Sequence, residues 1–210
     1  YAIVGMPGTG VPEGATVHVD IMGMITVRVG FAMEGQGQYT LISQLVADYF
    51  GTEIEAVRVV MLDTQSAPPS FGPGGSRLGV AITGAVLGAC EKIRSKMTRV
   101  VAGLMQTEPA HIQFQDGKFG IPGVEGAEMT VPEVAGTMLA RSDLLPPDID
   151  PRPEATHVWT AAGRTEADDQ GRAKSYLTAA QAVHVVALEI DRDTGQVEIT
   201  RYAVVDDCGT

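Results

Sequence analysis

Apolar residues recur along this chain with two periods, and each period predicts a different kind of element. Runs in which every second residue is apolar, bounded by Gly, Pro or Asp, predict strands. These runs cover residues 16–21, 24–29, 54–62, 112–114, 118–121, 156–160, 182–190 and 196–205. The run at 54–62 is mostly apolar, so that strand is expected to be buried. Short links between successive runs predict hairpins that turn at Met22-Gly23, Gln115-Asp116-Gly117 and Asp193-Thr194-Gly195.

Apolar residues spaced three or four positions apart predict three helices, at residues 39–50, 78–105 and from Thr130 to about Arg141. Gly51 is expected to end the first helix, and Thr130 is a good N-cap for the third. Three glycines, Gly79, Gly84 and Gly88, lie inside the longest helix, where each costs about 1 kcal/mol relative to Ala. We expect these glycines to let another backbone approach closely.

The order of these elements predicts the fold class. Strands come in hairpins and no regular alternation of strand and helix is present, which favours an α+β fold with helices packed on mixed, largely antiparallel sheets. Residues 1–145 are expected to form a first lobe. Residues 146–210 are expected to hold the end of a Pro-rich linker and the start of a second lobe. Because both ends lie in or beside strand-like runs, we expect both to be cuts in a longer chain.

Composition narrows the classes of partner and compartment. The chain has 210 residues, 44% of them hydrophobic, and a formal net charge of −11. An acidic chain without a basic stripe is not expected to bind nucleic acid. No apolar run is long enough to predict a membrane span, and the first residues do not resemble a secretion signal. The 2 cysteines are far apart in sequence, which favours a reducing, cytoplasmic setting.

Three glycine clusters compete for the role of a binding loop. Gly5-Met6-Pro7-Gly8-Thr9-Gly10 lacks the spacing of a dinucleotide fingerprint and is expected to be a plain turn. Gly35-Gln36-Gly37-Gln38 precedes a helix, whose unpaired first N–H groups suit an anion, and the Gln36 amide suits a heterocycle or an oxo group. A glycine-rich helix start with exposed glutamines explains the same residues equally well.

The third cluster, Gly74-Gly75-Ser76-Arg77, also precedes a helix. Backbone amides, a hydroxyl and a guanidinium make a suitable phosphate cradle, although a capped helix with a surface Arg is the alternative. The remaining candidates are the four histidines: His18, His111, His157 and His184. Their spacing is not that of a metal site, so no metal ligand is assigned.

Four segments match, in order, the motifs of one known family. Residues 35–40 are similar to the motif G-Q-G-H-x-T, and Val57-Arg58-Val59 with Asp63-Thr64 is similar to R-V-x followed by D-T. Residues 74–77 are similar to a G-S-R loop. Residues 184–209 are similar to H-V-x-x-V-E-V-D-x-x-T-G-x-V…D-x-G. Together they resemble the molybdopterin-binding large subunit of the xanthine dehydrogenase, aldehyde oxidase and carbon monoxide dehydrogenase family. The resemblance extends through essentially the whole chain.

The resemblance implies an oxidoreductase that hydroxylates carbon, or oxidises an aldehyde or carbon monoxide, with water as the oxygen source. The cofactor would be molybdenum–molybdopterin, in some members as a dinucleotide. Partner chains would carry two [2Fe–2S] clusters and FAD, and the remainder of the large subunit would complete the site around a small-molecule substrate. The protein's part is to position and polarise the cofactor.

Carried onto this chain, the resemblance implies a set of site residues. Gln36 would have the catalytic role, near the molybdenum oxo ligand or the pterin. The residues implied to bind the cofactor are Gln36, Gly37, Gln38, Thr40, Gly75, Ser76, Arg77, Asp207 and Cys208.

This sequence departs from the family in three ways. Gln38 stands where the family has His, and Leu78 and Gly79 replace the hydroxyl residues that often follow G-S-R. The family's catalytic Glu and substrate-loop residues fall outside these 210 residues, so no base is assigned and the chain alone is expected to be inactive. Two other functions stay open: a non-catalytic fragment or scaffold of the fold, and a nucleotide-binding module that uses Gly75, Ser76 and Arg77.

Overall fold

The computed structural model describes residues 2–7, 12–63, 65–160, 167–172 and 176–207. The chain forms two compact units. The larger unit consists of Val11–Pro73 and Leu78–Thr160, and the smaller of Tyr1–Gly10, Gly74–Arg77 and Ala161–Thr210. The boundary expected near residue 145 concerns the lobes of a longer chain and stays a prediction.

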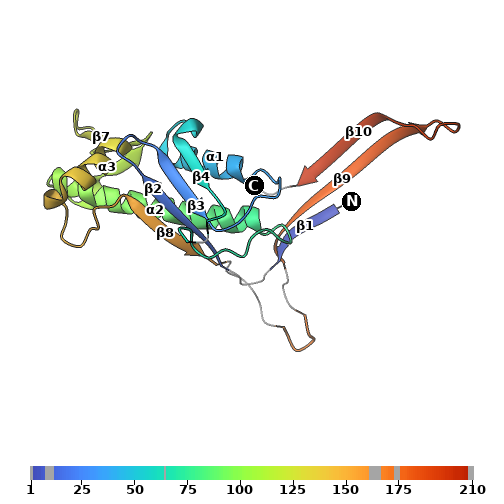
Figure 1. Cartoon of the computed structure of the whole chain (residues 1–210), viewed down its shortest axis with the longest axis horizontal. Helices are drawn as coiled ribbons and strands as arrows, with labels where there is room; N and C mark the ends of the chain where they lie inside the picture. Colours follow the sequence, from blue (N-terminus) through green and yellow to red (C-terminus); the bar gives the residue numbers. More distant parts are fainter. Residues whose placement is uncertain (1, 8–11, 64, 161–166, 173–175, 208–210) are drawn as a thin grey trace. The chain divides into compact units, whose positions relative to one another are not determined.

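The larger unit is built on a four-stranded sheet in the order β4-β3-β2-β8. Strand β2 (Glu13–Val19) pairs antiparallel with β3 (Ile25–Val29) and β8 (Glu154–Trp159), and β3 pairs parallel with β4 (Val57–Val60). Helices α1 (Gln38–Phe50) and α2 (Leu78–Leu104) lie side by side against one face of this sheet (Figure 1).

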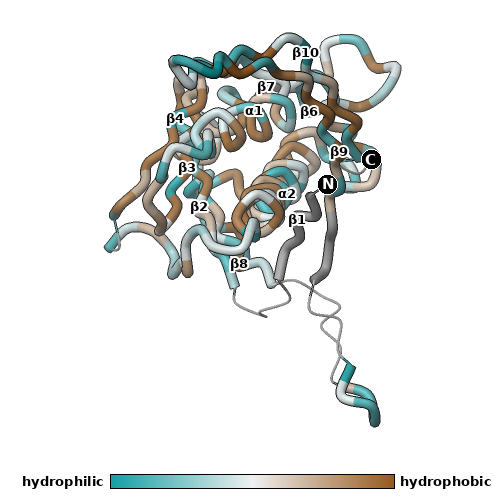
Figure 2. The backbone as a smooth tube through the Cα atoms, turned by 90° about the vertical axis from the view of Figure 1, so that its right-hand side faces the viewer, coloured by the Kyte–Doolittle hydropathy of each residue, from teal (hydrophilic) through white to brown (hydrophobic). Residues whose placement is uncertain are grey.

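The hydrophobic core lies between this sheet face and the two helices (Figure 2). Alternate residues of β2 and β3 contribute to it, as their period of two requires, and Ile82, Val86 and Ile93 of α2 are fully buried. The apolar stripe expected along the longest helix is therefore confirmed as its core-facing side. This packing fixes the ends of α1 and α2, where the candidate binding loops meet them.

A second, three-stranded sheet of the larger unit has the order β5-β6-β7. Its strands are β5 (Gln113–Gln115), β6 (Lys118–Gly120) and β7 (Glu128–Thr130), and α3 (Val131–Ala140) follows directly. Thr130 and Glu133 form a reciprocal capping box at the start of α3, which confirms the predicted N-cap. Three short 3₁₀ helices complete the unit: η1 (Ile54–Ala56), η2 (Pro109–His111) and η3 (Ser142–Leu144).

The smaller unit contains an antiparallel sheet in the order β1-β9-β10. Its strands are β1 (Ala2–Pro7), β9 (Tyr176–Ile190) and β10 (Val197–Asp207), and the last two form a long ribbon. A bulge at Thr200 inserts one residue between the pairs Ile199↔Leu188 and Arg201↔Ala187. The bulge keeps the two apolar halves of β10 on one face, because Tyr202 then lies on the same side as Ile199.

The α+β class and the three predicted hairpins are confirmed. Two expectations about strands are wrong. The run at 54–62 yields only β4, since its first residues form η1, and Val57 is the one buried residue of that strand. Gly5, Met6 and Pro7 lie in β1, paired with β9, where a turn was expected; the rest of that glycine cluster lies outside the described residues.

The expectation for the glycines of α2 also needs correction. A Cβ on Gly84 would lie 2.5 Å from the ring of Trp159, and one on Gly88 would lie 2.1 Å from the ring of His157. The close approach is therefore by side-chain rings of β8, not by another backbone. Gly79 has no atom within 4 Å of the corresponding position.

Candidate functional site

The connection between β3 and α1 has an open, glycine-lined face. Gly35 and Gly37 have φ of +99° and +81°, in the region that favours glycine, and no atom lies within 4 Å of a Cβ built on either. Gly37 is the N-cap of α1 and provides no side-chain cap. The first N–H groups of α1 thus retain their capacity to bind an anion or an acceptor.

Gln36, the residue predicted to be catalytic, is exposed on this loop. Its Oε1 accepts a hydrogen bond from the Glu34 backbone N–H at 2.8 Å, and its Nε2 donates to Glu34 Oε2 at 3.4 Å. The side chain therefore folds back on its neighbour in this structure. The long Nε2 contact is the weaker of the two, so the amide donor is the part of Gln36 that a ligand could most easily recruit.

Gln38 is the first residue of α1 and is only 7% exposed. Its Oε1 is buried and has no hydrogen-bond partner among the described residues. A buried acceptor left without a donor costs about 1–3 kcal/mol. A ligand that brings an N–H or O–H donor to the start of α1 would satisfy this oxygen. Thr40 lies in the same first turn and is exposed.

The turn before α2 has an unusual backbone. The Arg77 N–H donates to the Gly74 carbonyl at 3.2 Å, and the two central residues, Gly75 and Ser76, have φ of 55° and 57°. These values describe a type I′ turn. Ser76 is exposed, and its backbone is strained because a non-glycine residue rarely adopts the left-handed region. Arg77 is buried, with 3% of its surface exposed.

The last predicted binding residues lie at the end of β10. Asp207 pairs in register with Gln181 of β9 and is exposed, and Cys208 lies outside the described residues. The structure thus brings Gln36, Gly37, Gln38 and Thr40 together at the start of α1, in the larger unit. Gly75, Ser76 and Arg77 share one turn and belong, like Asp207, to the smaller unit.

One polar residue that pattern reasoning missed is Glu13. It is the first residue of β2 and is 0% exposed, and its carboxylate accepts a hydrogen bond from the Ser70 hydroxyl. The only signal in the sequence was an acidic residue just before an apolar run, which the structure shows to be the almost completely buried strand β2. A period of two does not reveal such a residue, because it cannot distinguish the rim of a sheet from a site covered by a distant loop.

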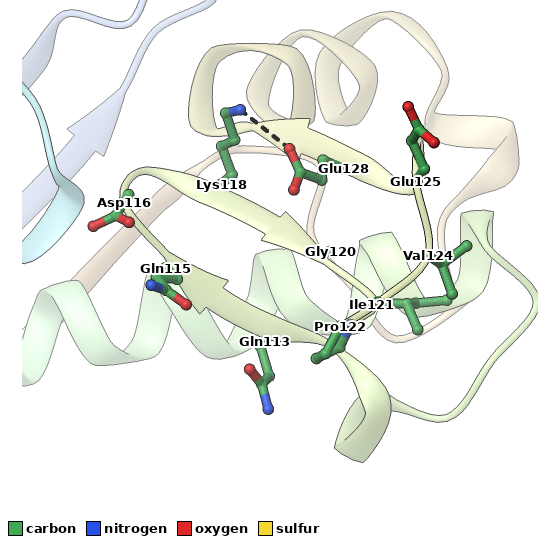
Figure 3. A pocket seen from close by; sticks show the side chains of 11 residues that line it. Gln113, Gln115, Asp116, Lys118, Gly120, Ile121, Pro122, Val124, Glu125 and Glu128 are labelled. Carbon is green, nitrogen blue, oxygen red and sulfur yellow. Dashed lines mark hydrogen bonds and ion pairs between the residues drawn. The ribbon is translucent and has the colours of Figure 1, made fainter.

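A surface cavity lies on the sheet β5-β6-β7. It has a volume of about 700 Å³ and is open to solvent, and Figure 3 shows that Lys118 and Glu128 form an ion pair at its rim, with Nζ and Oε2 3.1 Å apart. Neither this cavity nor the two smaller ones beside α2 is lined by a predicted site residue. Its lining residues come from β5, β6, β7 and the turns that join them.

Burial shifts the pKa of three groups: Cys90 of α2, Tyr49 of α1 and His157 of β8. Burial raises the pKa of the Cys90 thiol to about 12, which makes it unreactive. Burial, with a hydrogen bond from Tyr49 Oη to Glu91 Oε2 of 2.6 Å, raises the pKa of the Tyr49 phenol. Burial lowers the pKa of His157 beneath its ordinary value. None of these groups lies on a candidate binding loop.

The described part of the chain contains no cluster of three or more His, Cys, Asp or Glu side chains that could hold a metal ion. Among the same residues, no helix is long and apolar enough to cross a membrane.

Comparison with known proteins gives one family match that covers almost the whole chain. Residues 2–210 match a family model described as "Molybdopterin cofactor-binding domain". Among curated proteins, the chain is 24% identical over 203 residues to the carbon monoxide dehydrogenase large chain of Hydrogenophaga pseudoflava, covering 97% of this chain and 23% of that protein. It is 28% identical over 197 residues to the nicotine 6-hydroxylase large subunit of Paenarthrobacter nicotinovorans, covering 94% and 22%.

Solved structures give the same result for the fold. Quinoline 2-oxidoreductase from Pseudomonas putida 86 superposes with a TM-score of 0.78 at 25% identity, covering 99% of this chain and 26% of that one. Reconstituted CO dehydrogenase from Oligotropha carboxidovorans superposes with a TM-score of 0.81 at 24% identity, covering 99% and 25%. The chain thus spans about a quarter of the length of these relatives.

Proposed function

This chain belongs to the molybdopterin cofactor-binding domain family of molybdenum hydroxylase large subunits, and we propose from that premise that it grips the pterin of a molybdenum cofactor at the start of α1. The observation that carries the proposal is the buried, unpartnered Oε1 of Gln38 beside the open faces of Gly35 and Gly37. A pterin presents ring N–H and amino donors and a carbonyl acceptor, which matches this set of protein groups.

The roles of the residues follow from their donors and acceptors. Gln38 Oε1 would accept a hydrogen bond from the heterocycle, and the first amides of α1 would hold an acceptor or anionic group. The Gln36 amide would turn from Glu34 to donate toward the reacting end of the cofactor. Ser76 and Arg77 would bind the anionic end. Asp207 and Cys208 would approach the cofactor. When bound, the cofactor supplies two-electron oxidation chemistry.

The wider activity is part of the same proposal. The whole enzyme would oxidise a small organic or aldehyde-like substrate, or carbon monoxide, with water as the oxygen source. Electrons would pass to partner chains that carry [2Fe–2S] clusters and FAD. Support comes from the relatives, which include a carbon monoxide dehydrogenase and a nicotine 6-hydroxylase. The remainder of a large subunit would supply the base and the substrate-binding residues, and the complex would be cytoplasmic.

The test uses a variant whose effects on stability and on binding have opposite signs. Gln38→Leu removes the unpartnered acceptor, so the cofactor-free chain should gain roughly 1–3 kcal/mol of unfolding free energy. The same variant should retain less molybdenum and pterin after dialysis, because the acceptor for the heterocycle is gone. Gln44→Leu is the matched control, since Gln44 is an exposed glutamine of the same helix.

Elemental analysis and pterin fluorescence of the purified complex measure the second effect, and chemical denaturation measures the first. Full molybdenum and pterin retention in Gln38→Leu would remove the start of α1 from the cofactor site. A bound nucleotide without molybdenum would favour a nucleotide-binding module, and a complex free of both would favour a scaffold.

A further inference from the structure

Glu13 is a charged side chain that the fold buries completely at the beginning of β2. Removing a carboxylate from water is expensive, and a protein tolerates it only where donors surround the charge. One such donor is the hydroxyl of Ser70, which comes from the loop that follows β4. Glu13 and Ser70 also face each other across an isolated antiparallel bridge. The carboxylate is therefore joined to this loop and not only to its own sheet.

The Ser70 hydroxyl makes a second hydrogen bond. While it donates to Glu13, its oxygen accepts the backbone N–H of Gly72 at 3.1 Å. A hydroxyl that donates and accepts at once has a fixed orientation, so the position of Glu13 determines where the Gly72 amide lies. Gly72 has a φ of +79°, a conformation that glycine adopts without strain.

The same loop also packs against the sheet through Pro68, which lies close to Gly14 and Gly30. A Cβ on Gly14 would lie 2.6 Å from Pro68 Cβ, and a Cβ on Gly30 would lie 2.5 Å from the Pro68 carbonyl oxygen. Only glycine at both positions admits Pro68 this close. Two contacts therefore hold the loop on the sheet, and we call them together the anchor. One is the hydrogen bond between Ser70 and Glu13, and the other is the packing of Pro68 against Gly14 and Gly30. The anchor holds the loop at the edge where β2 begins and β3 ends.

Two residues after the anchored amide, the chain enters the strained turn at Gly74–Arg77. We propose that Glu13, acting through the Ser70 hydroxyl, is a positioning residue for this turn. The turn contains Gly75 and Ser76 in the left-handed region, and it presents groups suited to an anion. An anchored entry allows such a turn to hold its conformation before a ligand arrives, which lowers the ordering cost of binding. This inference rests on the proposed cofactor role of Ser76 and Arg77.

The test removes the hydroxyl and leaves the fold's apolar contacts in place. In Ser70→Ala, the Gly72 amide should exchange with solvent about tenfold faster, since it loses its acceptor. The purified complex should also lose molybdenum and pterin on dialysis. Ser66→Ala is the matched control. Its hydroxyl donates to the Asp63 carboxylate within the same loop and does not join the loop to the sheet. That control should change neither readout.

A conservative variant separates positioning from general stability. Glu13→Gln keeps an oxygen that accepts the Ser70 hydroxyl, so it should retain both the slow exchange of Gly72 and the cofactor. A loss of cofactor from Glu13→Gln as large as that from Ser70→Ala would overturn the acceptor role. Full cofactor retention in Ser70→Ala, when Arg77→Ala loses it, would overturn the inference and leave the proposed function intact. Full retention in both Arg77→Ala and Gln38→Leu would instead overturn the proposed function itself.

Discussion

At the scale of single residues, Gln38 is a polar side chain that the fold buries. Gln38 stands where the family motif has His, so the motif alone does not identify the group that Gln38 contacts. The structure shows a buried side chain with an unpartnered oxygen. No pattern in the sequence could reveal this, because burial of Gln38 depends on the packing of α1 in its unit. The role predicted for Gln36 stays a prediction.

For Gln36, we expect turnover to respond more than cofactor content. A fixed amide donor stabilises charge that grows during the reaction, so Gln36→Ala should reduce turnover per bound molybdenum by about a hundredfold or more. Gln36→Glu should be slower still, because a carboxylate would face the developing negative charge. Steady-state assays normalised to molybdenum, with a substrate accepted by the wild type, measure the effect. Normal rates in both variants would exclude a catalytic contact.

Cys90 should be chemically silent while the chain is folded. Burial raises its pKa from 9.0 to about 12, so at about pH 8 its thiolate is roughly a thousandfold rarer than in the unfolded chain. Because the folded-state value is the higher one, its stabilising contribution is complete below about pH 9 and declines as the pH rises toward 12. Maleimide labelling in a Cys208→Ser background should require denaturant. Rapid labelling of the native protein would contradict the burial.

At the scale of elements, the sequence predicts what local chemistry decides and fails where distant segments meet. The Thr130 capping box and the Asp116-Gly117 turn depend on neighbouring residues, and both can be identified in the sequence. The length of β4 and the neighbours of Gly84 and Gly88 depend on segments far along the chain. The period of α2 gave its buried face correctly, because that face is a property of one helix.

The glycines of α2 offer a direct test of this difference. Gly88→Ala should destabilise the fold by about 1–3 kcal/mol, since its methyl would overlap the ring of His157, despite the better helix propensity of Ala. Gly79→Ala is the control, because open space surrounds that position, and it should be neutral or stabilising by up to about 1 kcal/mol. Denaturation midpoints measure both. Equal effects at the two positions would contradict the packing of β8 against α2.

At the scale of the whole molecule, the hydrophobic core lies in the larger unit and the ribbon of β9 and β10 exposes apolar surface. Cross-strand pairs place one apolar set on one face of the ribbon: Val186, Leu188, Ile190, Val197, Ile199, Tyr202 and Val204. Leu188 and Ile199 are 49% and 58% exposed. The order of motifs in the sequence predicted the family, because the motifs lie on elements along the whole chain, whereas the substrate stays a proposal.

We therefore predict that the isolated chain associates through this apolar face. A paired change, Leu188→Lys with Ile199→Lys, should abolish concentration-dependent association without lowering the melting temperature, because neither side chain belongs to the core. Glu189→Lys with Glu198→Lys alters the opposite face by the same number of lysines and should leave association unchanged. Light scattering coupled to size-exclusion chromatography measures both. A monodisperse wild-type monomer over a wide concentration range would contradict the prediction.

The bulge at Thr200 separates the curvature of the ribbon from the composition of its apolar face. Thr200 is the extra residue, so its deletion would leave Ile199 opposite Leu188 and Tyr202 opposite Val186, with every side chain on its present face. Only the local bend and the added twist would disappear. The gain or loss of one residue at this position would therefore change the bend of the ribbon and leave the side chains on each face unchanged.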